Sequence, residues 1–409
     1  MNNWIALNWR ELLVRFALVF FCLALWPKGG IYLGVGMLTF AWLVDGGMSR
    51  CSGLLKEPLV AGILVFCAIW LLGLLWGDFA AITQGKWRKY FLLLAFIPLF
   101  SLLNRERLPW AAGALLSGYL GVVVLGSYQW VAQGMQGIPL LDMSYLSYSA
   151  TLGTGVILAV FLGWEALSAG KKIQSVLLWF AALLLLFLQL NQSARGLLIA
   201  TLAALLLMIV LRYRREWKRL AGGLTFIMLA VGLFAANSDV FQERLQQAYA
   251  DLQSFQQGVY VTSAGYRLAM WDVGLHGIAE KPLLGHGSGM AEKYFEDTIA
   301  TYKQGIYRDL PEFQNTAHYH NELIEIGVNL GILGILAFGF LLWSWFQSFK
   351  RHNLLLPGSA IVCFVFMAGW TDTFLLYSRI PSFLLAVTAI TIGWQKYQNT
   401  SDTVDLRQG

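Results

Sequence analysis

The sequence predicts an all-α polytopic membrane protein with about 12 transmembrane helices and one large, mainly helical outer loop. Three observations support this fold class. Hydrophobic residues make up 57% of the 409 residues and charged residues only 13%, against about 25% charged in soluble domains. The mean hydropathy is +0.60. Apolar runs recur along the whole chain, and one long polar stretch interrupts them. This composition excludes a soluble enzyme, a disordered chain and a disulfide scaffold.

Apolar segments that approach the length of a membrane span, about 20 residues, define the elements in order. They are 11–26, 31–44, 58–76, 90–103, 109–132, 145–167, 173–190, 196–211, 220–236, 321–347, 354–372 and 380–395. The first carries Arg15 and has no small-residue cleavage site behind it, which favours an uncleaved span over a signal peptide. Pro27 and two neighbouring glycines leave a re-entrant pair open for the first two segments.

The positions of Lys and Arg predict the orientation of these spans. With the N-terminus in the cytoplasm, the short inner loops receive most basic residues, above all the block Arg212–Arg219. Both termini are then cytoplasmic, and the net charge of +6 gives no indication of nucleic-acid binding. The predicted organisation is nine spans in 1–236, an outer loop over 237–320, three spans in 321–395 and a short cytoplasmic tail at 396–409.

Several basic residues fall on the outer side, against this bias. They are Lys28, Lys86, Arg88, Lys89, Arg195 and Arg379. One interpretation is that their side chains reach lipid head groups from the ends of the spans. The other is that they bind an anionic ligand, and we assign Lys86, Arg88 and Lys89 to a patch for anionic lipid.

The outer loop opens with an amphipathic helical stripe, in which Phe241, Leu245, Ala248, Leu252 and Phe255 share one face. Such a helix lies on the membrane, covers the spans as a lid, or simply packs on them. A second helix is predicted over 264–280, with Arg267 and Trp271 on one face. The run 285–289 is rich in glycine and suits either a phosphate cradle or a tight turn.

Ionisable residues at the ends of spans are functional candidates, because charge there is costly. Arg195 follows a short turn at the outer end of the eighth span. Asp372 ends the eleventh span, with Tyr377 and Arg379 close behind. A structural ion pair between Asp372 and Arg379 is an equally good interpretation.

His318 and His320 lie where the loop meets the tenth span. In an extended backbone, side chains two apart point to the same side, so the pair has metal-ligand potential. No third ligand has clear spacing, and we therefore expect no metal.

An ordered set of motifs resembles the O-antigen ligase family (WaaL type), within a group that also holds O-antigen polymerases and bacterial protein O-oligosaccharyltransferases. The motifs are Ser193 to Gly196, Arg267 with Trp271, the run Lys281 to Gly289, and His320 followed after ten residues by Gly331. The likeness covers about 190–335 in motifs and the whole chain in topology.

The resemblance implies a GT-C-like glycosyltransferase of the Gram-negative inner membrane with its site facing the periplasm. The implied reaction moves a glycan from undecaprenyl diphosphate to a sugar hydroxyl of lipid A–core in lipopolysaccharide biosynthesis. The partners are then this donor, this acceptor and membrane lipids, with no cofactor. By the same resemblance, Arg195, Arg267 and His320 match the essential positions.

Physical chemistry supports these roles. A leaving diphosphate needs concentrated positive charge, and Arg pairs bidentately with phosphate. The chain has no Asp-x-Asp motif of the kind that binds a divalent metal in many sugar transferases. Arg guanidinium groups would then stabilise the leaving diphosphate in place of a metal ion. A neutral hydroxyl acceptor benefits from a base such as His320, whose contribution is about 10²–10⁴-fold. Direct displacement inverts the anomeric centre, whereas a covalent intermediate would need a carboxylate such as Glu322 or Asp372.

Other functions remain open from the sequence. A polymerase would use the same chemistry on a second lipid-linked glycan. A protein O-oligosaccharyltransferase is less favoured, because many carry a C-terminal soluble region. A transporter of lipid-linked glycans would suit the many spans, but we find no inverted repeat in the sequence.

Overall fold

The computed structural model describes residues 9–78, 86–237, 239–310, 318–377 and 379–405. Its regular secondary structure is helical throughout these residues, apart from one isolated antiparallel bridge between Ile138 and Met143. The expected all-α class is therefore confirmed for the described part of the chain.

The first half of the chain forms helices that follow the apolar segments. They are α1 (Trp9–Ala24), α2 (Gly30–Val44), η1 (Gly47–Arg50), α3 (Cys51–Leu54), α4 (Pro58–Leu72), η2 (Gly73–Leu75), η3 (Lys86–Ala95), α6 (Phe96–Leu102), α7 (Leu108–Gln133), η4 (Pro139–Leu141), α8 (Tyr145–Ser168), α9 (Lys172–Leu190), α10 (Arg195–Tyr213) and α11 (Trp217–Asn237). Pro58 begins α4 at a position where a missing N–H costs nothing, and Ser144 caps α8.

The second half begins with the predicted outer loop. It contains α12 (Asp239–Gln256), α13 (Ser263–Glu280), α14 (Met290–Ile299) and η5 (Tyr302–Gly305), and is followed by α16 (Glu322–Arg351), α17 (Leu355–Thr371), η6 (Phe374–Leu376) and α18 (Arg379–Asp405). The helices expected at the stripe and over 264–280 are present as α12 and α13. Most side chains of the stripe, from Phe241 to Leu252, lie outside the described residues.

Each of the twelve predicted segments coincides with helical structure. By length and composition, 6 helices of the described chain are able to cross a membrane. They are Pro58–Leu75, α7, α8, α9, α10 and α16. The pair Gly30–Val44 and Gly47–Leu54, bent by 82°, would be a further span, and α17 is apolar but shorter. These helices support the prediction that the chain is a membrane protein. The total of twelve spans and the GT-C-like type stay predictions.

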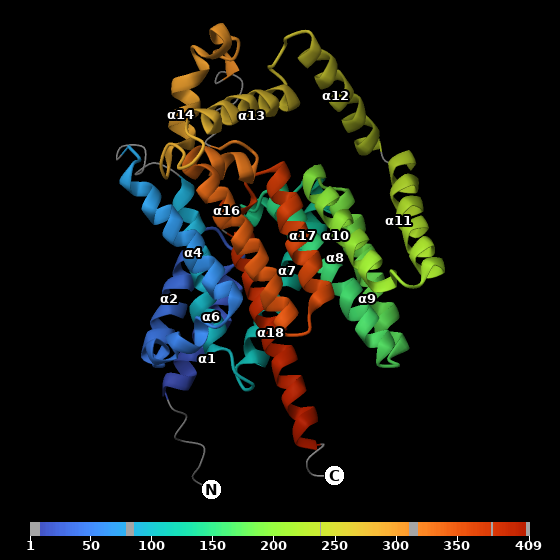
Figure 1. The fold of residues 1–409 in the computed structure, drawn as a ribbon. Coiled ribbons are helices and arrows are strands. Elements are labelled where there is room, and N and C mark those ends of the chain that lie inside the picture. Colours follow the sequence, from blue (N-terminus) through green and yellow to red (C-terminus); the bar gives the residue numbers. More distant parts are fainter. Residues whose placement is uncertain (1–8, 79–85, 238, 311–317, 378, 406–409) are drawn as a thin grey trace.

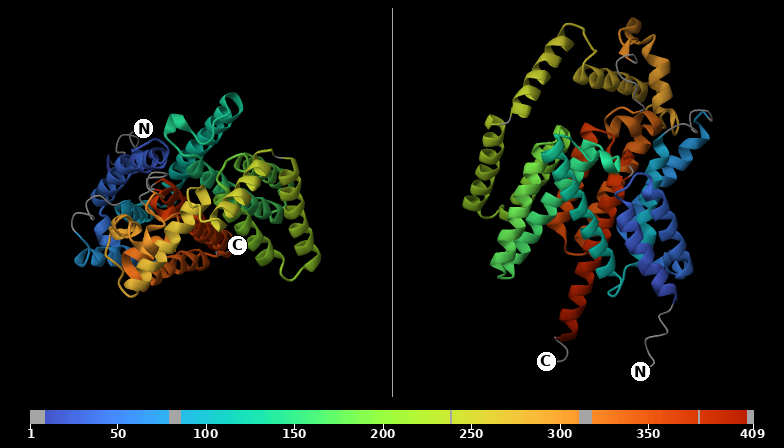
Figure 2. Two further views of the ribbon diagram at one scale, coloured as in Figure 1. Left: turned by 90° about the horizontal axis from the view of Figure 1, so that it is seen from above. Right: turned by 180° about the vertical axis from the view of Figure 1, so that it is seen from behind.

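The helices gather into one bundle with α12, α13 and α14 over one end (Figure 1). The view from behind shows the same arrangement, with α11 standing at the side of the bundle (Figure 2). α1 begins and α18 ends at the end of the bundle away from α12–α14. Both ends of the described chain therefore lie on one side, as the predicted orientation requires.

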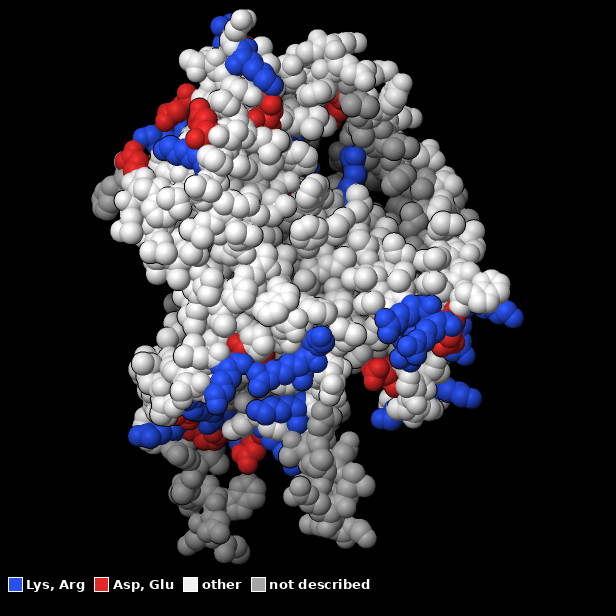
Figure 3. Space-filling view, viewed as in Figure 1, with Lys and Arg blue, Asp and Glu red and all other residues white. Residues whose placement is uncertain are grey.

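Basic side chains cluster at that same end of the bundle (Figure 3). At the start of α7, the buried Arg107 contacts Glu11 Oε2 at 2.5 Å and Asp45 Oδ1 at 3.1 Å. These contacts join the ends of α1, α2 and α7. Arg50 adds a second ion pair to Asp45 at 2.6 Å. The concentration of Lys and Arg on this side fits the predicted cytoplasmic face.

Two hydrophobic cores hold the structure. The larger one runs through the bundle, where α4 packs on α16 and α10 packs on α17. The smaller one lies under α13 and α14 and includes Tyr266, Met270, Phe295 and Tyr319. Because α13 also packs on α16, the outer loop and the bundle meet where α16 begins.

Candidate active site

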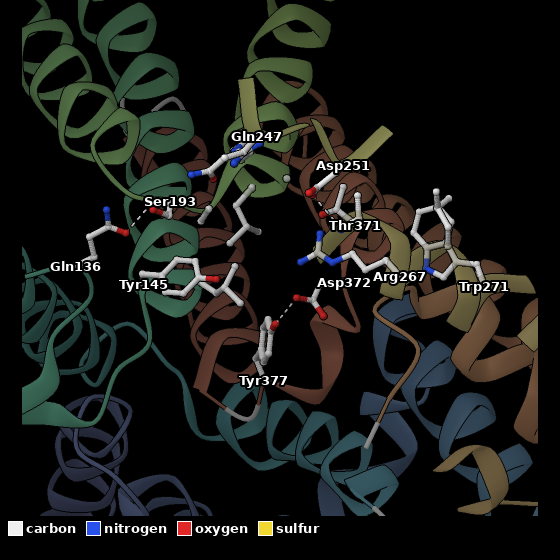
Figure 4. Close-up of a pocket in the computed structure, with 17 residues that line it drawn as sticks. Gln136, Tyr145, Ser193, Gln247, Asp251, Arg267, Trp271, Thr371, Asp372 and Tyr377 are labelled. Atoms are coloured by element: carbon white, nitrogen blue, oxygen red, sulfur yellow. Dashed lines mark hydrogen bonds between the residues drawn. The ribbon is translucent and has the colours of Figure 1, made fainter. Parts of the chain in front are cut away.

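A pocket of about 560 Å³ lies where the ends of α8, α10 and α17 meet α12 and α13. Figure 4 shows the residues that line it. Arg195, Arg267, Asp372 and Tyr377 are all among them. The structure therefore brings together four predicted site residues from widely separated parts of the sequence.

Arg195 reaches the pocket as the first residue of α10. The first N–H groups of a helix carry partial positive charge, so this end also favours an anion. Gly196 allows α10 to approach α17 closely, because a Cβ at Gly196 would overlap the side chain of Thr371. The Ser193 to Gly196 motif thus supplies a charge and keeps it near Asp372, the residue after Thr371.

Arg267 lies in α13 and is half-buried. One turn later, Trp271 also lines the pocket, which confirms that the two share a face. The Trp271 indole Nε1 donates to the Tyr319 carbonyl at 3.0 Å, which fixes α13 against the start of α16. Within the described residues, Arg267 makes no hydrogen bond or ion pair. Its guanidinium donors are therefore available to a ligand.

Asp372 connects the pocket to His320. Its Oδ1 accepts hydrogen bonds from His320 Nδ1 at 3.0 Å and from the Thr373 backbone N at 2.8 Å, and its Oδ2 accepts from the Tyr377 hydroxyl at 2.5 Å. A carboxylate only accepts, so Nδ1 of His320 carries the proton. Nε2 is then the ring nitrogen that has a lone pair for a substrate proton.

The residue after this histidine fixes its position. Asn321 Oδ1 accepts from the backbone N of Leu323 at 3.0 Å and of Ile324 at 3.1 Å, which caps α16. Its Nδ2 donates to the Trp370 carbonyl at 3.0 Å, at the end of α17. His320 itself has a left-handed φ of 50°, an uncommon conformation for a side-chain-bearing residue. The His-Asn pair thus joins α16 and α17 beside Asp372.

The protonation states follow from burial and these contacts. Burial would raise the pKa of Asp372, but the hydrogen bonds from His320 and Tyr377 and the His318 ring nitrogen 3.5 Å from Oδ1 outweigh it and hold this pKa well below its usual range. Burial lowers the pKa of His318, although Asp372 opposes the shift. Burial and the neighbouring carboxylate raise the pKa of Tyr377 well above its usual range. At neutral pH, Asp372 is charged, His318 is neutral and Tyr377 keeps its proton.

His318, His320 and Asp372 also form a possible metal site, because one ligand atom from each lies within 4.8 Å of the others. Two imidazoles and one carboxylate are a common set for Zn²⁺. Asp372, which lies far along the chain, is thus the possible third ligand that the sequence did not reveal. Asp372 nevertheless already accepts hydrogen bonds on both oxygens, and a site without metal stays our prediction.

The Lys86–Lys89 patch lies in η3, outside the pocket lining. Lys86 and Arg88 are exposed and Lys89 is half-buried. The next residue, Tyr90, donates its hydroxyl to Glu322 Oε1 at 2.5 Å, two residues after His320. The patch is therefore connected to the histidine end of the site.

Glu322 serves as a structural link. It is buried, and its Oε2 accepts from the Leu375 backbone N at 2.9 Å. Together with the Tyr90 hydrogen bond, this joins η3, α16 and η6. Glu322 does not line the pocket, so Asp372 is the better placed of the two carboxylates considered for a covalent route.

The glycine-rich run 285–289 supplies backbone hydrogen bonds at a break in α16. Gly331 has φ 59° and ψ −152°, which interrupts the helix. The backbone N of His286 and of Gly287 donate to the Val328 and Asn329 carbonyls at 2.9 and 2.8 Å, and the Ile332 N donates to the Pro282 carbonyl at 2.8 Å. These amides are engaged in the protein, so the structure favours a close-packed turn over a phosphate cradle.

Arg379 does not pair with Asp372, whose contacts are the histidines and Tyr377 described above. It begins α18, outside the pocket lining, and one of its guanidinium nitrogens is buried without a partner among the described residues. Asp142 is the nearby acid, and its own ion pair is with Lys28 at 2.8 Å. The proposed Asp372–Arg379 ion pair is therefore wrong.

Several pocket residues were not found from the sequence. They are the neutral polar and acidic side chains Gln136, Tyr145, Gln247 and Asp251. Gln136 lies in a turn between two glycines, and Gln247 lies on an otherwise polar face of a helix. The sequence around each of these two residues resembles that around any solvent-exposed polar residue. Only the folded structure therefore shows that they line a pocket.

These features define a class: a helical membrane protein with an arginine-lined pocket at one end of its bundle and a carboxylate–histidine pair beside it. Residues 179–339 match the family model described as O-antigen ligase. This range contains Arg195, Arg267 and His320. The family whose model matches this part of the chain is thus the one that the ordered motifs resemble.

Two curated relatives agree. The chain is 28% identical over 180 residues to the O-antigen ligase of Escherichia coli K12, covering 42% of this chain and 42% of that protein. It is 24% identical over 259 residues to a Rickettsia conorii protein named as a polysaccharide ligase, covering 62% and 58%. The chain thus spans about half the length of the curated relatives it matches.

Proposed function

We propose that this protein is an O-antigen ligase, which transfers a glycan from undecaprenyl diphosphate to a sugar hydroxyl of lipid A–core. The observation that carries the proposal is the pocket. Arg195 and Arg267 line it together with Asp372, and Asp372 holds His320 at 3.0 Å. Two anion-binding groups and an oriented base are what glycosyl transfer from a lipid diphosphate requires.

In the proposed reaction, His320 Nε2 takes the proton of the acceptor hydroxyl. The acceptor oxygen forms a bond to the anomeric carbon as the bond from that carbon to the diphosphate oxygen breaks. The leaving diphosphate takes the electron pair, and Arg195 and Arg267 stabilise its growing charge. The anomeric centre inverts. Asp372 keeps Nδ1 protonated and stabilises the imidazolium that forms.

The remaining predicted site residues have supporting roles in this proposal. Tyr377 holds the second oxygen of Asp372, and neutral His318 packs on His320 with ring centroids 4.4 Å apart. Lys86, Arg88 and Lys89 attract an anionic lipid, such as the acceptor. Arg379 begins α18, two residues after Tyr377, and we assign it to the same basic surface for anionic lipid.

We propose that the protein lies in the inner membrane of a Gram-negative cell, with both termini cytoplasmic and the pocket facing the periplasm. The lipid-linked donor and the lipid A–core acceptor both present their sugars there. The basic end of the bundle, away from α12–α14 (Figure 3), supports this orientation.

An O-antigen polymerase is the nearest alternative, since it would join one lipid-linked glycan to another with the same residues. A protein O-oligosaccharyltransferase would use a hydroxyl of a protein acceptor. A transporter is less favoured, because the backbone groups at the break in α16 are bonded to 282–287 and are not open to a transported ion.

One assay separates these functions. Purified protein is given undecaprenyl-diphosphate glycan with lipid A–core, with more donor, or with a protein acceptor, in the presence of EDTA. Product on lipid A–core supports the ligase, a longer donor supports a polymerase, and glycoprotein supports the third activity. Loss of activity with EDTA that Zn²⁺ restores would show that His318, His320 and Asp372 hold a metal.

Matched variants test the residues in the same assay. Arg195→Ala and Arg267→Ala should abolish transfer, and His320→Ala should lower it about 10²- to 10⁴-fold, while each protein still inserts and folds. Arg308→Ala and His276→Ala are controls, because both residues belong to the same loop but lie outside the pocket lining. Near-normal transfer by His320→Ala would show that the base is another group.

A further inference from the structure

The pocket has room for more than a diphosphate. Its volume of about 560 Å³ lies within the range of roughly 300–1,000 Å³ for pockets that enclose whole small molecules. In the donor of the proposed function, on which this inference rests, a sugar is bonded directly to the diphosphate. That sugar must therefore enter the same pocket and meet its remaining polar side chains.

Two carboxamides line the pocket away from the arginine of α13. Figure 4 shows Gln136 and Tyr145 on the side across from Arg267, with Gln247 above and Asp372 and Tyr377 below. A carboxamide offers two donors and one acceptor, and a sugar hydroxyl both donates and accepts. These uncharged groups match a neutral polyhydroxyl ligand better than they match a phosphate.

The Gln136 amide is held in a fixed orientation. Its Oε1 accepts from the Ser193 backbone N at 3.0 Å. The next residue, Gly137, donates its backbone N to Gln192 Oε1 at 2.9 Å, which fixes the turn that carries Gln136. The Gln136 amide nitrogen makes no hydrogen bond within the described residues, so it remains a donor for a ligand. A fixed donor loses little conformational entropy when it binds.

The helix α12 covers the pocket and adds two more polar groups. Gln247 and Asp251 are four residues apart, so they lie on the same face of α12, and both line the pocket. Asp251 Oδ2 accepts from the Ala264 backbone N at 3.3 Å, which ties α12 to the start of α13. This connection places the Gln247 side chain over the same pocket that Arg267 lines.

Aromatic rings complete this lining. Trp271 and Tyr145 both line the pocket, and each presents an apolar ring face beside a polar edge. The Trp271 ring is fixed by its hydrogen bond to the Tyr319 carbonyl. A sugar ring is amphipathic in the same way, with C–H groups on its faces and hydroxyls at its edge.

We propose that Gln136, Gln247 and Asp251 bind the hydroxyl groups of the sugar joined to the diphosphate, and that Gln247 determines which sugar is accepted. Arg195 and Arg267 bind the charged part of the donor, which is common to all lipid diphosphates. Specificity for the glycan then comes from the amide side of the pocket and from α12.

The test compares two donors whose first sugars differ only at C4, namely polyprenyl-diphosphate N-acetylglucosamine and polyprenyl-diphosphate N-acetylgalactosamine. Transfer to lipid A–core is measured with the wild type, Gln247→Leu and Gln246→Leu. Gln246 is the matched control, because it is an exposed residue of the same helix outside the pocket lining. Inhibition by polyprenyl diphosphate without sugar is measured for each protein.

Gln247→Leu should lower kcat/KM for the better donor about 3- to 10-fold, the effect of one lost hydrogen bond, and bring the ratio between the two donors closer to one. Inhibition by sugar-free diphosphate should not change, and Gln246→Leu should behave as the wild type. An equal loss for both donors, weaker inhibition by the sugar-free lipid, or no difference from Gln246→Leu would overturn the inference. A wild type that transfers neither donor would instead contradict the proposed function.

Discussion

Replacing Asp372 with Asn removes the charge that orients His320 while keeping the size of the side chain. Asp372 accepts from His320 Nδ1 at 3.0 Å, and an Asn there either accepts weakly or donates and reverses the histidine tautomer. A hydrogen bond to a charged group contributes about 1.5–3 kcal/mol, and about 1.4 kcal/mol changes a rate tenfold. We therefore expect kcat to fall about 10- to 150-fold, with the KM for the donor unchanged.

The assay is steady-state transfer by Asp372→Asn, His320→Ala and the double variant. Because Asp372 acts through His320, the second substitution should change kcat of His320→Ala by no more than about twofold. Asp309→Asn, at an exposed site in the outer loop, is the control. An additive loss in the double variant would refute a positioning role, and a complete loss in Asp372→Asn alone would indicate a covalent nucleophile.

Three further predictions follow from the same geometry. Arg195→Lys and Arg267→Lys should keep part of the activity that the Ala variants lose, since Lys keeps the charge without the bidentate fork; equal transfer by Lys and Ala variants would contradict this. Gly331→Ala should lower the stability by about 1–3 kcal/mol because of its φ of 59° and lower the melting temperature in detergent, whereas Gly339→Ala, which has open space around it, should not. Because the pKa of Asp372 is held well below its usual value of about 3.9, its stabilisation is complete above pH 4–5 and is lost as pH falls further. The melting-temperature difference between the wild type and Asp372→Asn should thus shrink as the pH falls below about 4, and a difference that is the same at pH 5 and at pH 3 would refute the assignment.

Much of the fold could be predicted, because apolar length and the distribution of charge are properties of local sequence. The site was partly predictable for the same reason. Arg195 and Asp372 are charges next to apolar runs, so each stands out in its own segment. Their meeting depends on Gly196 against Thr371, a contact between α10 and α17 that no local pattern contains.

The interpretations that the structure excludes have a common physical cause. The Asp372–Arg379 ion pair was inferred from proximity in sequence, whereas Asp372 bonds to His320, which precedes it by 52 residues. The third possible metal ligand was missed for the same reason. For the glycine-rich run, the sequence left a phosphate cradle open beside a tight turn, because the partners of its amides, the Val328 and Asn329 carbonyls, belong to a different helix. In each case, the observed structure depends on hydrogen bonds between residues that are far apart in the sequence.

The break at Gly331 has a consequence for how the chain assembles in a bilayer. Unpaired backbone groups cost several kcal/mol each in hydrocarbon, so the two halves of α16 cannot form a complete span unaided. Their missing partners are in 282–287, a segment that is synthesised first. We therefore expect the loop segment 282–287 to be in place before α16 completes its backbone hydrogen bonds. In this protein, residues that precede α16 in the sequence thus complete the backbone hydrogen bonding of that helix.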